Sequence, residues 1–363
     1  MKEAVAIAWI NDPGPHGQWG SPNELTLPIN ERGLLLADGL FETVLVLDGQ
    51  PRLLAEHLGR WHHSAALLGL AKPPGEATVG PLIQEAISRS RIGCGALRLN
   101  WSRGSSSRGI AIPPADAEGS SNAEKASRAH RFWLQLSPHQ PNFDPVRVIV
   151  SPTERRCATS VLNQCKTFAY GPSIQARRQA HAAGADDALL PSSSGELSCG
   201  TTSNLMVRSG LGGGWITPPL SSGCLPGIMR QRALVLGVAQ ERSIDETVLV
   251  GSSGALLINS LGSRAISHLG PTALPIAPGC RGLVAGPALV AALNGDPVGE
   301  TGGCLISRCS NPEIHLGHHL AGVGGEGAPL ATRARGRCKG GFVDHLKGGA
   351  IGELQEAFHR VGG

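Results

Sequence analysis

Aromatic residues are scarce in this chain, at 4% of 363 residues with a single tyrosine, Tyr170. Long apolar runs are missing as well, because none approaches the ~20 residues that span a bilayer. The start, MKEAVAIAWINDPG, lacks the features of a signal peptide. No basic run is interleaved with aromatic residues, which argues against nucleic-acid binding. We therefore expect a cytoplasmic protein with neither a nucleic-acid nor a membrane partner.

Paired cysteine motifs are also missing. The nine cysteines include no CxxC pair and no zinc-ligand spacing, so an odd, scattered set is typical of reduced thiols. The HLGHH segment at 315–319 has no acidic or cysteine partner at a suitable spacing, and we expect no metal site. The formal net charge of +4 is small and is compatible with an anionic small-molecule substrate.

The hydrophobic periodicity predicts an α+β fold. In residues 39–70 a strand-like run ends at the turn pair Asp48-Gly49, and apolar residues at helical spacing begin at Leu53. Comparable patterns predict helices over 79–91 and 170–183, strands over 95–104, 131–138 and 146–152, strand pairs within 186–210 and 255–269, and a strand, a loop and a helix within 213–237.

The domain prediction rests on a linker and on a change in composition. HQPNFDP at 139–145 is the best linker, between a small N-terminal α/β lobe at 1–138 and a larger lobe at 146–285. The segment 113–130 is small, polar and proline-led, and is interpreted as a surface loop. The glycine-rich tail at 286–363 buries too little apolar surface to offset its ordering entropy, and is predicted to be mostly disordered.

Five collinear motifs resemble the fold-type IV pyridoxal-phosphate enzymes. They are NERGLLLADGLFET (30–43), EHLGRW (56–61), CKTFAYGPSIQARRQAHAAGADDALL (165–190), GELSCGTTSNLMV (195–207) and ITPPLSSGCLPGIMRQ (216–231). The family includes branched-chain aminotransferases, D-amino acid aminotransferases and 4-amino-4-deoxychorismate lyases. The resemblance covers about residues 5–275 and implies a two-lobed fold like that of D-amino acid aminotransferases, pyridoxal 5'-phosphate in the larger lobe, and a homodimer.

The resemblance implies a catalytic role for Lys166. Pyridoxal phosphate is attached to a lysine amine as an imine, and the freed amine later moves protons. Lys166 matches the family's lysine and is expected at the front of an amphipathic helix; for an arbitrary lysine, a solvated surface charge would be the ordinary interpretation. Tyr170 lies four residues later, so one helical turn would place it on the same face, suited to hydrogen-bonding the cofactor's ring oxygen. A packing role for Tyr170 is the alternative.

The cofactor's phosphate is expected to meet an arginine and backbone N–H groups. Arg60 matches the family's phosphate arginine, with an exposed helix arginine as the alternative. The N–H groups of Ile228 and Met229 follow a Pro-Gly turn and would open a helix toward the phosphate. Asn259 and Ser260 align with a second phosphate loop, although Asn-Ser also forms ordinary turns.

The chain departs from the family at Cys199. The resemblance places a glutamate five residues before the asparagine of the Ser-Asn pair, where it contacts the pyridine nitrogen and strengthens the ring as an electron sink. Counting back from Asn204 gives Cys199. Glu196 is three residues earlier, and in a strand an odd offset points to the opposite face. A thiol is a weak hydrogen-bonding group, so a weaker electron sink is expected here.

The segment SRGSSSRGI at 102–110 resembles that of the aminodeoxychorismate lyases. Arg103 and Arg108 are the predicted substrate-binding residues, since two arginines on a glycine-rich loop suit a dicarboxylic substrate; a solvated basic turn is the alternative. The leading expectation is a lyase that forms 4-aminobenzoate and pyruvate for folate synthesis. A class IV aminotransferase, acting on branched-chain or D-amino acids, and a non-catalytic pyridoxal-phosphate-binding relative remain alternatives.

Overall fold

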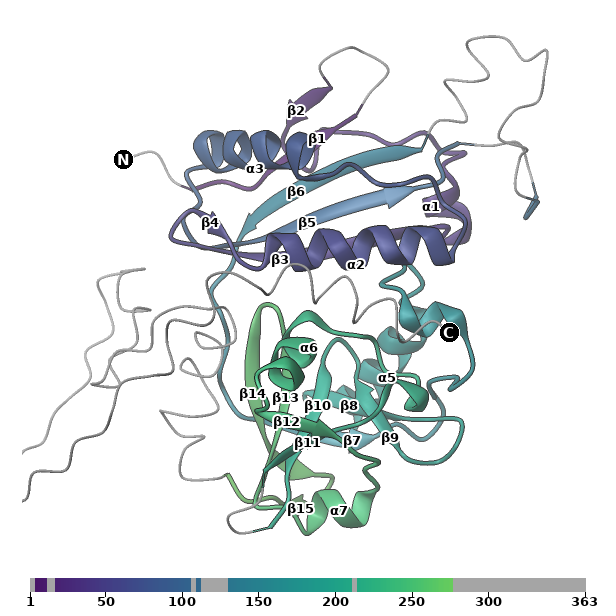
Figure 1. Cartoon of the computed structure of the whole chain (residues 1–363), viewed down its shortest axis with the longest axis vertical. Coiled ribbons are helices and arrows are strands. Elements are labelled where there is room, and N and C mark those ends of the chain that lie inside the picture. The colour runs from purple at the N-terminus through teal and green to yellow at the C-terminus, as the bar shows by residue number, and fades with distance from the viewer. Residues whose placement is uncertain (1–3, 12–16, 106–108, 112–129, 211–213, 277–363) are drawn as a thin grey trace, which may run out of the picture. The chain divides into compact units, whose positions relative to one another are not determined.

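The computed structural model describes residues 4–11, 17–105, 109–111, 130–210 and 214–276 (Figure 1). By their contacts the residues divide into two units, Met1–Ser310 and Asn311–Gly363, and every described residue belongs to the first. The predicted tail at 286–363 and nearly all of the predicted loop at 113–130 lie outside the described residues. The predicted domain boundaries therefore stay a prediction.

The first half of the described chain forms a six-stranded antiparallel sheet in the order β2-β1-β6-β5-β3-β4. At the predicted turn between β3 and β4, Asp48 and Gly49 both have positive φ, as a tight hairpin requires. The strands are β1 (Ile7–Ile10), β2 (Gln18–Gly20), β3 (Gly39–Leu47), β4 (Gln50–Pro51), β5 (Gly95–Ser102) and β6 (Arg131–Pro138).

Among the described residues, the helices that accompany this sheet are α1 (Arg32–Leu36), α2 (Leu54–Leu67) and α3 (Glu76–Ser90). Helix α2 lies along β3, and α3 contacts β1 and β6 (Figure 1). The core between them includes the fully buried Trp61, Phe132 and Leu97. The buried face of α2 also carries two residues that ionise, His57 and Arg60, which is unusual for an apolar core.

The second half forms a nine-stranded sheet that runs in the order β12-β11-β10-β13-β14-β7-β8-β9 with β15 beside β14. Because β9 also pairs with β10, six of these strands close into a barrel-like ring. The strands are β7 (Val146–Val150), β8 (Asp187–Pro191), β9 (Leu197–Gly200), β10 (Asn204–Arg208), β11 (Trp215–Thr217), β12 (Ala239–Glu241), β13 (Gly254–Asn259), β14 (Gly262–Leu269) and β15 (Thr272–Ala273).

The helices of this half are α5 (Gly171–Ala182), α6 (Ile228–Val235) and α7 (Glu246–Val250), with short 3-10 turns at Val161–Gln164 and Leu220–Ser222. The α+β prediction is confirmed. The prediction of two strands within 186–210 is wrong, because β8, β9 and β10 occupy this segment. The short connection at 201–203, which separates β9 from β10, was not recognised in the sequence. None of the helices in the described ranges is long and apolar enough to cross a membrane.

Candidate active site

Lys166 lies on an extended segment that joins the first sheet. The N–H of Phe41 donates to the carbonyl of Lys166 at 2.9 Å, and the N–H of Phe168 donates to the carbonyl of Gly39 at 3.1 Å. A Cβ at position 39 would collide with the Phe168 ring and would lie 2.9 Å from the carbonyl oxygen of Trp101, so only glycine allows this approach. Backbone pairing therefore fixes the position from which the half-buried Lys166 side chain extends.

Tyr170 contacts Lys166, but not for the predicted reason. The Lys166 Nζ donates to the Tyr170 hydroxyl at 3.0 Å. Helix α5 begins only at Gly171, with Tyr170 as its N-cap, so the prediction that both residues share one helical face is wrong. Pairing of the 166–168 segment with β3 keeps Lys166 out of the helix, and a long-range contact of this kind leaves no trace in helical periodicity.

Lys166 and Arg98 both lie close to the ring of Phe41, and Arg98 is an arginine that the sequence prediction missed. The Lys166 Nζ lies 4.4 Å from the centroid of the Phe41 ring, and the Arg98 guanidinium carbon lies 3.5 Å from the same centroid. The Arg98 Nε donates to Asn100 at 2.7 Å. Burial lowers the pKa of Arg98, and the nearby Tyr170 opposes that shift, so the guanidinium stays protonated. Arg98 is thus a second cation at the Phe41 ring.

Helix α6 begins at Ile228, directly after the Pro-Gly turn, and a phosphate contact of Ile228 and Met229 stays a prediction. Gly227 is the N-cap residue and offers no side chain to the first N–H groups of the helix. A Cβ at Gly227 would collide with the amide oxygen of Asn204, whose amide nitrogen donates to the carbonyl of Leu225 at 2.9 Å. The sequence thus leaves the N–H groups at this helix end without a side-chain cap, as an anion site requires.

Arg60 is buried and not the exposed helix arginine of the alternative interpretation. Its Nε and one terminal nitrogen donate to the two oxygens of Glu42, at 2.8 and 2.5 Å, and its other terminal nitrogen donates to the carbonyl of Pro226 at 3.0 Å. Burial raises the pKa of Glu42, but the charge of Arg60 and the hydrogen bond from His57 outweigh burial and hold it at about 2. Arg60 therefore reaches the loop before α6 as part of a buried ion pair.

Ser260 and Asn259 come from the turn between β13 and β14. The Ser260 hydroxyl lies 3.2 Å from His57 Nε2, and the Asn259 side chain accepts from the N–H of Leu261 and donates to the carbonyl of Thr202. Hydrogen bonds thus link α2 both to this turn and to the loop before α6. Of the two predicted residues, Ser260 lies in this hydrogen-bond chain, whereas Asn259 bonds to its own turn and to Thr202.

Cys199 lies in an apolar cluster on β9. Its neighbours in that cluster include Ala176, Ala180, Leu190 and Cys224. Burial raises the pKa of the Cys199 thiol to about 11, with Arg156 opposing the shift, so the thiol is protonated and uncharged at neutral pH. The carboxylate of Glu196, which precedes β9, accepts from the Ser194 hydroxyl in an exposed turn. Position 199 therefore presents a neutral group.

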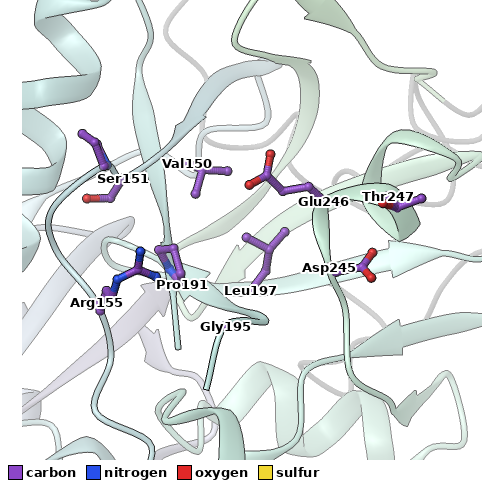
Figure 2. Close-up of a pocket in the computed structure, with 10 residues that line it drawn as sticks. Val150, Ser151, Arg155, Pro191, Gly195, Leu197, Asp245, Glu246 and Thr247 are labelled. Carbon is purple, nitrogen blue, oxygen red and sulfur yellow. The ribbon is translucent and has the colours of Figure 1, made fainter. Parts of the chain in front are cut away.

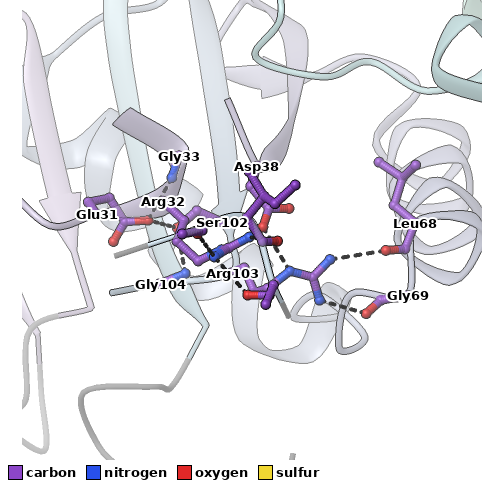
Figure 3. A network of polar contacts seen from close by, with 12 residues as sticks. Glu31, Arg32, Gly33, Asp38, Leu68, Gly69, Ser102, Arg103 and Gly104 are labelled. Carbon is purple, nitrogen blue, oxygen red and sulfur yellow. Dashed lines mark hydrogen bonds and ion pairs between the residues drawn. The ribbon is translucent and has the colours of Figure 1, made fainter. Parts of the chain in front are cut away.

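Arg103 is committed to a polar network that anchors the loop after α2 (Figure 3). Its Nε donates to Asp38 at 2.9 Å, and its terminal nitrogens donate to the carbonyls of Gly69 and Leu68 at 2.8 and 3.1 Å. Arg108 lies outside the described residues. Contact of Arg103 with substrate stays a prediction, and the structure gives this side chain a clear structural role.

Asp38 also holds a second arginine, Arg32, through a 2.8 Å bond to its Nε (Figure 3). The terminal nitrogens of Arg32 donate to the carbonyls of Gly109, Ile110 and Ala111 at 3.2–3.3 Å. Burial raises the pKa of Asp38, but the hydrogen bonds from its two arginines outweigh burial and lower it. The network therefore fixes residues 109–111 against α1.

A cavity of about 450 Å³ in the second half is separate from these residues (Figure 2). None of the ten residues that line it is a predicted site residue; Arg155, Asp245 and Glu246 supply its charges. Within the described residues, no group of three or more histidine, cysteine or acidic side chains is placed to hold a metal ion.

The residues assembled around Lys166 fit pyridoxal phosphate. The Lys166 amine, hydrogen-bonded to the Tyr170 phenol, is the kind of group that the cofactor's aldehyde requires. Arg60 makes three bonds to described residues, which leaves two of the five guanidinium N–H donors unused within that part of the chain. It lies beside the uncapped start of α6. Cys199 fits less well, because a neutral thiol replaces an expected carboxylate.

Comparison with known proteins identifies the family. The sequence profile described as "Amino-transferase class IV" matches residues 39–269, which is more than half of the chain. The chain belongs to the class IV aminotransferase family. As a member of that family it uses pyridoxal 5'-phosphate, in agreement with the prediction. A Methanocaldococcus jannaschii protein with the provisional name branched-chain-amino-acid aminotransferase is 27% identical over 63% of this chain and 75% of its own length.

Other relatives carry different activities in their names. The D-alanine aminotransferase of Listeria innocua is 25% identical over 61% of this chain and 72% of that protein. The 4-amino-4-deoxychorismate lyase structure from Pseudomonas aeruginosa has a TM-score of 0.59 and 26% identity, and covers 76% of this chain and 96% of that one. The fold IV-transaminase of Curtobacterium pusillum has a TM-score of 0.62 and 25% identity, over 80% and 98%. The fold-type IV prediction is confirmed.

Proposed function

We propose that this class IV enzyme is a lyase that converts 4-amino-4-deoxychorismate to 4-aminobenzoate and pyruvate. The observation that carries the proposal is the neutral, buried thiol of Cys199. Transamination needs a well-stabilised carbanion, which a charged partner at the pyridine nitrogen supports. The lyase forms an aromatic product, and aromaticity supplies driving force of its own. A weak electron sink should therefore harm transamination more than this elimination.

The site residues fall into a group that would bind the phosphate and a group that would transfer protons. When bound, pyridoxal phosphate supplies an aldehyde that captures the substrate amine and a ring that withdraws electrons. Arg60, the N–H groups of Ile228 and Met229, and Ser260 would hold its phosphate. The Lys166 Nζ, once free, removes the proton from the substrate carbon that bears the amine and delivers a proton to the departing enolpyruvyl group. Tyr170, 3.0 Å from that nitrogen, holds it in place.

Arg98 is the substrate-binding residue that the geometry favours. The substrate carries two carboxylates, and a guanidinium pairs with a carboxylate through two parallel N–H donors. Within the described part of the chain, Arg98 uses Nε on Asn100 and stacks on Phe41, which leaves its terminal nitrogens for an anion near Lys166. Arg103 and Arg108 remain proposed contacts from the sequence motif, with Arg103 the less available of the two.

An aminotransferase is the second candidate, because the sequence relatives named above carry aminotransferase names. The same lysine, phosphate site and Arg98 would serve a transaminase that accepts an amino acid carboxylate. The two candidates differ in their products: a transaminase converts the bound cofactor to its amine form with an amino acid, and a lyase releases pyruvate from aminodeoxychorismate without an amino acceptor.

Product analysis tests the lyase proposal. The protein is incubated with pyridoxal phosphate and enzymatically generated 4-amino-4-deoxychorismate, and 4-aminobenzoate and pyruvate are both quantified. We expect equimolar products. The absence of both products, from a protein whose absorbance shows bound cofactor, would contradict the proposal.

We also propose that the protein is a homodimer. Ile29, Leu34 and Leu35 are 88%, 64% and 62% exposed, and such neighbouring apolar side chains favour burial in an interface. Leu34 and Leu35 lie on α1, whose Gly33 contacts Phe168 two residues after the lysine. We expect sedimentation at twice the monomer mass, and a shift toward monomer in Leu34→Glu. Leu67→Glu makes the same change at an exposed leucine of α2 and serves as the control. A wild-type monomer at micromolar concentration would refute the dimer.

A further inference from the structure

The residues that are hydrogen-bonded around His57 carry no net positive charge to offset the cofactor's phosphate. Glu42 Oε2 accepts from His57 Nδ1 at 2.7 Å and from Arg60, and Ser260 Oγ lies 3.2 Å from His57 Nε2. The charges of Glu42 and Arg60 cancel within this buried pair. A phosphate dianion that arrives beside Arg60 and Ser260 therefore meets a group of residues with no net charge.

The same bonds determine the direction of each proton. Ionised Glu42 is only an acceptor, so His57 Nδ1 must carry the hydrogen. In a neutral imidazole the other nitrogen is then an acceptor, and the Ser260 hydroxyl must donate to it. Ser260 in this state turns its hydrogen toward His57 and presents only lone pairs to a phosphate oxygen. The two oxygens then repel each other.

A second proton on His57 resolves both problems at once. With Nε2 protonated, His57 donates to Ser260, and the Ser260 hydroxyl hydrogen is released for a phosphate oxygen. The imidazolium adds one positive charge between Glu42 and the phosphate. We propose that His57 takes up a proton from solvent when the phosphate of pyridoxal phosphate binds, and so acts as a positioning residue that turns the Ser260 hydroxyl toward the phosphate.

The charged neighbours of His57 agree with a neutral ring before binding. The groups that face it are Glu42 on β3, Arg60 on its own helix α2, and Lys166 on the extended segment after β7, with Ser260 as its uncharged partner. Burial lowers the pKa of His57, the bond to Glu42 opposes that shift, and Arg60 and Lys166 lower the pKa further. A phosphate dianion is the addition that reverses this balance.

The inference rests on the proposed phosphate site, and calorimetry separates the two. Pyridoxal phosphate is titrated into the full-length apoprotein at pH 7.5, where the free phosphate is already a dianion. Two buffers of different ionisation enthalpy give the number of protons taken up. We expect an uptake larger by about one proton in wild type than in His57→Gln, and equal uptake in wild type and His63→Gln, a control at an exposed histidine of the same helix.

Each result supports or overturns a defined claim. Equal uptake in wild type and His57→Gln overturns the role of His57 while leaving the cofactor site intact. Failure of wild-type protein to bind the cofactor overturns the proposed site itself. If His57→Gln does not fold, the wild-type affinity decides: we expect the dissociation constant to fall by up to about tenfold for each unit of pH decrease between pH 8 and 6.5. A constant affinity across that range overturns the inference.

Discussion

Lys166→Ala should lose the release of 4-aminobenzoate and pyruvate by at least about 10²–10⁴-fold, the contribution of a positioned proton-transfer group. The variant should also lose the imine absorbance of the bound cofactor, because Lys166 supplies the amine that contacts the Tyr170 hydroxyl. Spectra and product assays on the same preparation measure both effects. Alanine should be tolerated structurally, since the backbone pairing at Lys166 involves only main-chain atoms.

The matched control is Lys72→Ala, which removes an exposed lysine between α2 and α3. It should keep both the absorbance and the turnover. Lyase activity retained in Lys166→Ala would show that another group transfers the proton, and it would remove the main reason for placing the active site at this residue.

Glu42→Ala should lower the free energy of unfolding by about 3–5 kcal/mol, the cost of leaving a buried ion-pair partner uncompensated. In this variant Arg60 and His57 both lose their carboxylate partner, and each is at least 95% buried. Denaturant unfolding of the apoprotein measures the loss. Glu85→Ala is the control, because its pair with Arg89 is about half exposed and should cost less than about 1 kcal/mol.

The same carboxylate predicts a pH effect with a defined sign. The pKa of Glu42 is depressed in the folded protein from 4.5 to about 2. Its contribution to stability is therefore fully present above pH 4.5 and is lost as the pH falls toward 2. Glu42→Ala should accordingly lose part of the acid sensitivity of the wild-type protein. Equal stability of Glu42→Ala and wild type at pH 7 would mean that the ion pair contributes nothing net.

Local patterns predicted the elements well where the structure depends on local spacing. The buried face of α2 and the hairpin at Asp48-Gly49 both follow from residues adjacent in sequence or one helical turn apart. The extended segment at Lys166 depends instead on pairing with β3, more than a hundred residues earlier. Periodicity contains no information about such pairing. The predicted range of 170–183 agrees with α5, but the expectation that Lys166 stands at the front of this helix was wrong.

The candidate site divides in the same way. Motif order located Lys166, Arg60 and the start of α6, because their spacing along the chain is itself the signal. Glu42 and Arg98 were missed, since each lies in a strand whose apolar neighbours suggested packing alone. A partial signal for Glu42 was present: two residues that ionise, His57 and Arg60, occur three apart on a buried helical face, and buried charges require a partner.

The most direct test of the central claim compares both reactions in one preparation of the protein. Pyruvate release from aminodeoxychorismate is measured beside the conversion of the bound cofactor to its amine form by glutamate, D-alanine and a branched-chain amino acid. With a neutral thiol at Cys199, we predict rapid lyase turnover and slow conversion with all three amino acids. Rapid cofactor conversion by any of them, with no pyruvate from aminodeoxychorismate, would contradict the account and identify an aminotransferase.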